Sequence, residues 1–153
     1  MRTALLAIVV SLAFSGLAFA QDEAPPPCGP AGDLGMEFSK NVSADSRCFE
    51  IRMYTAEPEM DGKGGIDNLH RRFREGEAAL FEKHGAEIVW SWQSLDNPNT
   101  LIWMLAYKDR AHRDKVFADF RADPEWHELR AKYEVPLNAE VFMMSATDYS
   151  KFK

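Results

Sequence analysis

The chain has 153 residues, a length typical of a single domain. Its formal net charge is −6. This charge disfavours nucleic acid as a partner, because phosphate binding requires a basic surface.

The first 20 residues have the pattern of a cleavable signal peptide. Met1 and Arg2 form a short positive segment, residues 4–17 are mostly apolar, and Ala18-Phe19-Ala20 matches the small-residue cleavage motif. The apolar run is shorter than the roughly 20 residues that a membrane-spanning helix needs. We therefore expect residues 1–20 to be removed and the mature chain to be periplasmic or secreted, without a membrane attachment.

Residues 21–46 are rich in proline and glycine and contain few large apolar side chains. They are expected to form an arm that does not fold alone. Cys28 lies in this arm and Cys48 lies where the regular patterns begin. Export permits a disulfide, so we predict that Cys28 and Cys48 form one. The alternative is two free thiols.

Regular patterns occupy residues 47–153, which we expect to form one domain. Period-two alternation over residues 49–55 predicts a strand. Apolar residues recur at helical spacing over residues 66–84, and Gly85 follows as a helix-ending residue. A helix is therefore predicted after the first strand.

The next two strands are predicted over residues 87–95 and 100–108, joined by the turn Asp96-Asn97-Pro98-Asn99. Asp109 is suited to cap a helix over residues 110–122. Pro124 is suited to begin a further helix over residues 125–133.

Residues 138–147 predict the last strand. The order β-α-β-β-α-β predicts a ferredoxin-like α+β fold, in which helices cover one face of a four-stranded antiparallel sheet. Residues 101–107 and 141–144 are apolar at nearly every position. A strand that is apolar on both faces needs cover on both. We therefore predict a homodimer in which two sheets pack face to face.

Four segments resemble the NIPSNAP family, within the dimeric α/β-barrel superfamily. They are Glu50-Ile51-Arg52-Met53-Tyr54-Thr55, Glu82-Lys83-His84-Gly85, Ala106-Tyr107-Lys108-Asp109 and Asp123-Pro124-Glu125-Trp126. The resemblance covers about residues 48–145. It implies the fold and the dimer more than a reaction, because the superfamily includes monooxygenases, isomerases and haem-binding enzymes.

Two departures from the family pattern matter. The third strand has Trp103 and Leu105 where the family often has His and Trp. The loop between Thr55 and Ile66 is also longer and richer in glycine than is usual. A ligand role that depends on a histidine in the third strand is therefore not transferred to this chain.

The first candidate ligand-binding residues are Glu50, Arg52 and Tyr54, which share one face of the first strand. If the alternate apolar residues of that strand pack under the helices, these three point into the space between the sheets. Arg52 would bind an anionic group and Tyr54 would donate a hydrogen bond. The alternative is a structural ion pair that fixes the dimer.

The second candidate set is aromatic. A four-residue turn would place Trp90, Trp92, Trp103 and Tyr107 on one sheet face, where they would form a wall for a small hydrophobic or aromatic ligand. The alternative is ordinary core. A change of one residue in the loop length would reverse this arrangement.

No sequence motif for a metal, a cofactor or a nucleophile is found. The four histidines, His70, His84, His112 and His127, form no metal-binding pattern, and no cofactor is expected. Two functions stay open. The preferred one is a binding module. The other is a cofactor-free enzyme, similar to a monooxygenase or an isomerase, in which Arg52 and Tyr54 polarise a substrate oxygen and Glu50 moves protons.

Overall fold

The computed structural model describes residues 24–153, so the predicted signal peptide over residues 1–20 lies outside the described part. The strands form one antiparallel sheet in the order β2-β3-β1-β4. Their bounds are Cys48–Ala56 for β1, Glu87–Gln93 for β2, Thr100–Tyr107 for β3 and Leu137–Ser145 for β4. The predicted ferredoxin-like α+β fold is confirmed.

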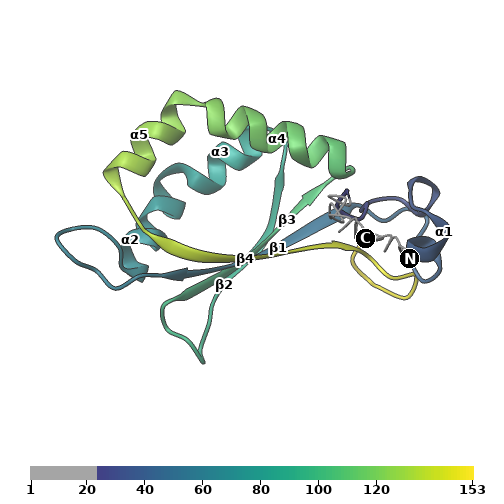
Figure 1. Ribbon diagram of the computed structural model, residues 1–153, viewed down its shortest axis with the longest axis horizontal. Helices are drawn as coiled ribbons and strands as arrows, with labels where there is room; N and C mark the ends of the chain where they lie inside the picture. Colours follow the sequence, from purple (N-terminus) through teal and green to yellow (C-terminus); the bar gives the residue numbers. More distant parts are fainter. Residues whose placement is uncertain (1–23) are drawn as a thin grey trace, which may run out of the picture.

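The helices that follow the strands all cover the same face of the sheet (Figure 1). They are α2 (Ile66–Arg72), a π-helical turn η2 (Phe73–Glu77), α3 (Ala78–Lys83), α4 (Arg110–Ala122) and α5 (Pro124–Lys132). Within residues 24–153, no helix lies on the opposite face of the sheet (Figure 1). The molecule thus has a helical layer, a sheet layer and one open sheet face.

The first predicted helix is interrupted. A continuous helix over residues 66–84 was expected, but the π-helical turn separates α2 from α3 and the chain is kinked at Gly76. A Cβ atom at Gly76 would lie 3.2 Å from a methyl carbon of Leu129 in α5. The glycine therefore allows α5 to approach this turn closely.

The other two helices begin as predicted. The Asp109 side chain accepts a hydrogen bond from the backbone N–H of His112 at 2.7 Å and caps α4. The Asp123 side chain accepts one from the backbone N–H of Glu125 at 2.9 Å and caps α5. These caps satisfy backbone donors that have no partner inside the helix.

The core lies between the helices and the sheet, around Trp103 of β3. The Trp103 side chain is fully buried. Its ring centroid lies 5.4 Å from that of Tyr54, 4.9 Å from that of Phe73 and 5.2 Å from that of Phe81. These contacts, edge-to-face for Tyr54 and Phe73 and tilted for Phe81, join β1, β3 and the helical layer in one aromatic cluster.

The open sheet face is also apolar. The register places on it the side chains of Phe49, Ile51, Met53, Trp90, Trp92, Ile102, Met104, Phe142 and Met144. Trp92 is 47% exposed and Phe142 is 52% exposed. Phe152, near the C terminus, covers one end of this face, with its ring 5.6 Å from Phe49 and 5.2 Å from Trp90.

The arm packs against one end of the domain rather than extending as a free linker. It contains a short 3-10 turn, Ala31–Asp33, and a short helix, α1 (Met36–Ser39), which lies at the same end as the C terminus (Figure 1). Cys28 and Cys48 are both buried and joined by a disulfide, as predicted. The neighbouring Gly29 N–H donates to Ser145 Oγ at 3.0 Å.

Removal of the disulfide should destabilise the domain. The two cysteines are separated by 20 residues, and closing a loop of that size stabilises a fold by about 3 kcal/mol in the chain-entropy model. We expect the double variant Cys28→Ser/Cys48→Ser to lose about this much free energy of unfolding in urea titrations. Reduced wild-type protein should match the double variant. An unchanged free energy of unfolding would show that the arm is held without the bridge.

Candidate functional site

The polar side chains of β1 lie under the helices. Glu50 is fully buried, and Tyr54 is 7% exposed. The prediction that these residues point away from the helices, into a space between two sheets, is wrong. It assumed that the apolar face of β1 is the covered one, whereas Ile51 and Met53 lie on the open face.

Glu50 is the centre of an ion-pair network that joins the sheet to α4. Its carboxylate accepts hydrogen bonds from Arg52 and, at 2.7 and 3.1 Å, from Arg113. Both oxygens are therefore held by guanidinium groups of the same chain. The sequence left two interpretations of Glu50 open, a ligand-binding residue and a structural ion pair that fixes a dimer. The structural ion pair fits better, but it connects β1 to α4 within one chain.

Arg52 continues this network toward a pocket. Its Nε donates to the Tyr54 hydroxyl oxygen at 2.7 Å. The guanidinium also lies over the rings of Trp103 and Phe117, at 5.8 and 5.0 Å from their centroids. These contacts fix the position of Arg52 and leave the Tyr54 O–H free to donate to another group.

The pocket has a volume of about 500 Å³ and lies between the sheet and the helices, on the side of β4. β1 contributes Arg52 and Tyr54, and the start of β4 contributes Leu137. The helices contribute most of the remaining lining residues, which are Arg72, Glu77, Phe81, Phe117, Phe120, Arg121, Trp126 and Arg130. We call it the sheet–helix pocket.

A second buried ion pair lies in this pocket. Arg72 Nε donates to Glu77 Oε2 at 2.7 Å, and the two side chains are only 6% and 3% exposed. Burial raises the pKa of Glu77, because removing a carboxylate from water disfavours its charged form, and the nearby charge of Arg72 opposes this rise. Neither residue was identified from the sequence.

A sequence signal for Glu77 was nevertheless available. Glu77 lies four residues after Phe73 and three before Leu80, and both of these belong to the predicted apolar stripe of the helix. A carboxylate on such a stripe must be buried, and a buried charge needs a partner.

Tyr54 is suited to donate a hydrogen bond into the sheet–helix pocket. Burial raises the pKa of Tyr54 to about 12, and the positive charge of Arg52 partly opposes this. The hydroxyl therefore keeps its proton at neutral pH. Since its oxygen accepts from Arg52, the hydroxyl can donate its own proton to a second group.

The charge of the pocket is positive. Its lining holds the guanidinium groups of Arg52, Arg72, Arg121 and Arg130 and the single carboxylate of Glu77. Within residues 24–153, Arg121 and Arg130 form no ion pair. An anionic group at the pocket would meet two guanidinium groups that are not neutralised.

The predicted aromatic wall is divided between the two faces of the sheet. Trp103 and Tyr107 lie buried on the helix face, whereas Trp90 and Trp92 lie on the open face. The hairpin loop spans residues 94–99, so Trp92 pairs with Ile102 and not with Trp103. The prediction that the four residues share a face is wrong because the register differs by one residue.

A bulge in β2 completes this arrangement. The register between β2 and β3 shifts between Ile88 and Trp90, so that Ile88 pairs with Leu105 and Trp90 with Met104. Because an extra residue reverses the side-chain alternation, Ile88 packs against the core while Trp90 faces the open side.

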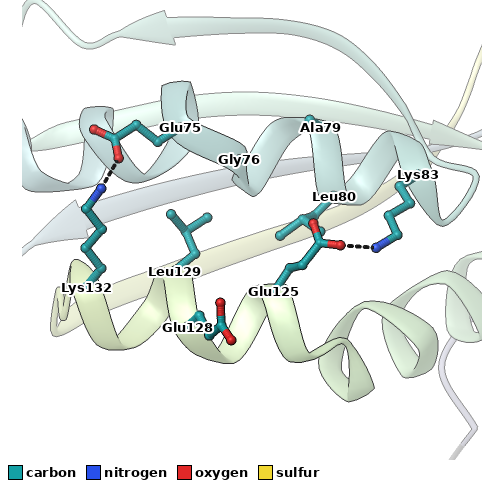
Figure 2. Close-up of a pocket in the computed structure, with 9 residues that line it drawn as sticks. All are labelled: Glu75, Gly76, Ala79, Leu80, Lys83, Glu125, Glu128, Leu129 and Lys132. Atoms are coloured by element: carbon teal, nitrogen blue, oxygen red, sulfur yellow. Dashed lines mark hydrogen bonds and ion pairs between the residues drawn. The ribbon is translucent and has the colours of Figure 1, made fainter.

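A second hollow, of about 450 Å³, lies between α3 and α5 (Figure 2). Figure 2 shows two ion pairs that bridge it, Glu75 with Lys132 at 2.6 Å and Lys83 with Glu125 at 2.8 Å, and Leu129 between them. Four of its five charged side chains form these exposed ion pairs, and the fifth, Glu128, is exposed on α5. The hollow is therefore better interpreted as a contact between two helices than as a ligand site.

The Glu82–Gly85 and Asp123–Trp126 segments of the family resemblance meet at the end of α3. Lys83 Nζ and His84 Nε2 lie 2.9 and 2.8 Å from Asp123 Oδ2. These bonds lower the pKa of Asp123 to about 2, the bond from Lys83 contributing most. Since Asp123 also caps α5, the two segments fix the position of α5 and therefore one wall of the sheet–helix pocket.

Two of the remaining histidines have hydrogen-bond partners. His70 Nε2 lies 2.8 Å from Gln93 Oε1, and His112 Nδ1 accepts from the backbone N–H of Lys108 at 3.1 Å. His127 is exposed on α5. In the part of the chain that is described, no three His, Cys, Asp or Glu side chains are arranged to hold a metal ion. No helix over residues 24–153 is long and apolar enough to cross a membrane.

The fold is that of a ferredoxin-like α+β domain, with a pocket between its sheet and its helices. The NIPSNAP family model matches residues 49–151. The chain belongs to the NIPSNAP family. No curated protein matches this sequence.

Solved structures agree with this assignment. A NIPSNAP family protein of unknown function from Agrobacterium tumefaciens str. C58 matches with a TM-score of 0.63 and 20% identity, over 74% of this chain and 99% of its own. A NIPSNAP-like domain protein from Burkholderia xenovorans matches with a TM-score of 0.59 and 18% identity, over 68% of this chain and 88% of its own. These similarities support the fold.

Proposed function

We propose that this chain is an exported, homodimeric binding protein that holds a small aromatic anion in the sheet–helix pocket. The observation that carries the proposal is the pocket lining, in which aromatic rings lie beside the Tyr54 hydroxyl and two guanidinium groups that form no ion pair within residues 24–153. Rings favour a flat apolar body, and the guanidinium groups favour a carboxylate. The ligand site therefore lies under the helices, and not between two sheets.

Export is supported by the disulfide. A bridge between Cys28 and Cys48 persists in an oxidising compartment and is rare in a reducing one. The signal-peptide pattern over residues 1–20 is consistent with this location. We propose the periplasm or the exterior of the cell as the location.

The ligand proposal is tested with 1-naphthoate, monitored by tryptophan fluorescence. Arg121→Gln/Arg130→Gln should weaken binding by about tenfold or more, because each charge-assisted hydrogen bond contributes about 1.5 kcal/mol or more. The uncharged 1-naphthalenemethanol should bind more weakly than naphthoate and should be insensitive to the double variant. Arg74→Gln, which removes an exposed arginine outside the pocket, is the matched control. No saturable binding of either compound would overturn the proposal.

The homodimer is proposed from the open sheet face. Its apolar side chains extend over all four strands, and two of them, Trp92 and Phe142, are about half exposed. A second copy presents an equally apolar and equally twisted surface, which is the most direct cover for such a face.

Phe142→Lys should convert the dimer to a monomer. A charge at this position would be buried against the partner sheet without a counter-charge. The free-energy cost of burying it exceeds what the contacts of one interface normally offset. Light scattering at micromolar concentration should give a dimer mass for the wild type and a monomer mass for the variant. The matched control is Leu95→Lys, in the exposed hairpin loop, which should remain dimeric. A monomeric wild type would contradict the proposal.

A further inference from the structure

Glu77 is not fully explained by its ion pair with Arg72. One carboxylate oxygen, Oε2, accepts from Arg72 at 2.7 Å. The other, Oε1, accepts no hydrogen bond from residues 24–153, and it is not among their buried polar atoms that lack a partner. Because Glu77 lines the sheet–helix pocket, Oε1 is open to the pocket space. A purely structural ion pair would not need this opening.

The backbone places Glu77 there by an irregular turn. Glu77 is the last residue of the π-helical turn Phe73–Glu77, directly after the kink at Gly76. Such turns occur often at functional sites, because they change the direction of one side chain without ending the helix. Leu129 packs against Gly76 from α5 and holds the turn in place.

Burial in the pocket gives Glu77 the properties of a base. Burial raises its pKa from an ordinary 4.5, and the charges of Arg72 and Arg52 only partly oppose the rise. A carboxylate with a raised pKa accepts and returns a proton more readily near neutral pH. The charge of Glu77 also raises the pKa of Tyr54, which places the two groups within electrostatic reach of each other.

We propose that the sheet–helix pocket catalyses keto–enol proton transfer in small aromatic 2-oxo acids, with Glu77 as the base and the Tyr54 hydroxyl as the donor to the ketone oxygen. The proposal deepens the ligand site proposed above and depends on it. The carboxylate of such a compound would meet Arg121 and Arg130. Its ring would lie among Phe81, Phe117, Phe120 and Trp126.

The step needs no further reactant. Glu77 Oε1 takes a proton from the carbon between the ring and the ketone, and the C–H electron pair becomes the new C=C bond. The C=O electron pair moves to the oxygen, which accepts the hydrogen bond from Tyr54. Transfer of the Tyr54 proton to this oxygen gives the enol. Glu77 then loses its acquired proton to water and Tyr54 regains one from water, so both groups return to their starting state. If Glu77 instead returns a proton to carbon, the ketone is restored. The net reaction is a tautomerisation.

The test uses phenylpyruvate in D₂O, where the proton acquired by Glu77 exchanges with the solvent, so that its return to carbon introduces deuterium. Loss of the benzylic proton signal is followed by NMR and compared with buffer alone. Wild-type protein should accelerate the exchange, and Glu77→Gln should lower the protein-dependent rate by about 100-fold or more. Glu128→Gln, on the exposed surface of α5, is the matched control and should keep the wild-type rate.

Four further measurements separate the possible outcomes. Glu77→Asp should restore part of the rate, and the wild-type rate should fall on acidification through a pKa above 4.5. Thermal unfolding and naphthoate binding report whether Glu77→Gln is folded. If phenylpyruvate binds but the exchange is not accelerated, or if Glu77→Gln exchanges as fast as wild type, the catalytic proposal is overturned and the binding proposal stands. If naphthoate binds but phenylpyruvate does not, the proposed substrate class is wrong. If neither compound binds, both proposals fail.

Discussion

Glu50→Ala is expected to lower the free energy of unfolding by about 3–5 kcal/mol. The substitution leaves the guanidinium groups of Arg52 and Arg113 without their shared carboxylate, below α4. These side chains are 13% and 20% exposed, so water compensates for little of the loss. Breaking a buried pair by removing one partner is costly because it leaves an uncompensated charge. Urea titration monitored by circular dichroism measures the change.

The matched control is Glu87→Ala. Glu87 pairs with Arg47 at the surface, where the two side chains are 55% and 33% exposed, and such a pair contributes about 1 kcal/mol or less. If Glu50→Ala costs no more than Glu87→Ala, the network around Glu50 does not stabilise the fold. A triple variant that removes all three charges, Glu50→Leu/Arg52→Met/Arg113→Met, should recover much of the loss, because no isolated charge remains.

The helices and strands of this domain were largely predictable, because local chemistry determines where they begin and end. Asp109 and Asp123 cap α4 and α5 as expected. Gly85 follows α3 with a φ of 103°, a conformation that glycine adopts without strain. The π-helical turn at residues 73–77 was not predicted, because it forms where Leu129 packs closely on Gly76. That contact joins parts of the chain that are distant in sequence.

The faces of the sheet were not predictable from β1 alone. Its alternation separates an apolar set from a polar set, and burial of the apolar set is the usual outcome. Here the polar set is covered by the helices, because Glu50 finds Arg113 on α4, 63 residues away in the chain. Nothing within β1 specifies that partner. The apolar set lies on the open face and is the reason for proposing a second copy of the chain.

The candidate site was predicted in part. Arg52 and Tyr54 do line a pocket together, although on the other side of the sheet from the one expected. Arg72 and Glu77 were missed because the helix was described by its apolar residues alone. Arg121 and Arg130 line the same pocket as Arg72 and Glu77 only because α4 and α5 pack against the sheet.

Trp103→Ala should also cost about 3–5 kcal/mol of unfolding free energy, because it removes a fully buried indole and leaves a cavity that the aromatic cluster fills only in part. The informative control is Trp92→Ala, since the sequence placed both residues in one wall. Trp92 lies on the open face and is 47% exposed, so its removal should change the stability of the protomer little.

The two variants should therefore affect different properties, Trp103→Ala the stability and ligand binding and Trp92→Ala the dimerisation. Trp103→Ala should lower the urea midpoint at every protein concentration and should weaken naphthoate binding, because Trp103 supports Arg52 and Tyr54 from below the sheet–helix pocket. Trp92→Ala should leave naphthoate binding unchanged and should shift the dimer–monomer equilibrium toward monomer in light scattering. If Trp92→Ala weakens ligand binding as much as Trp103→Ala does, the ligand lies on the open face, and the site must be placed between two sheets after all.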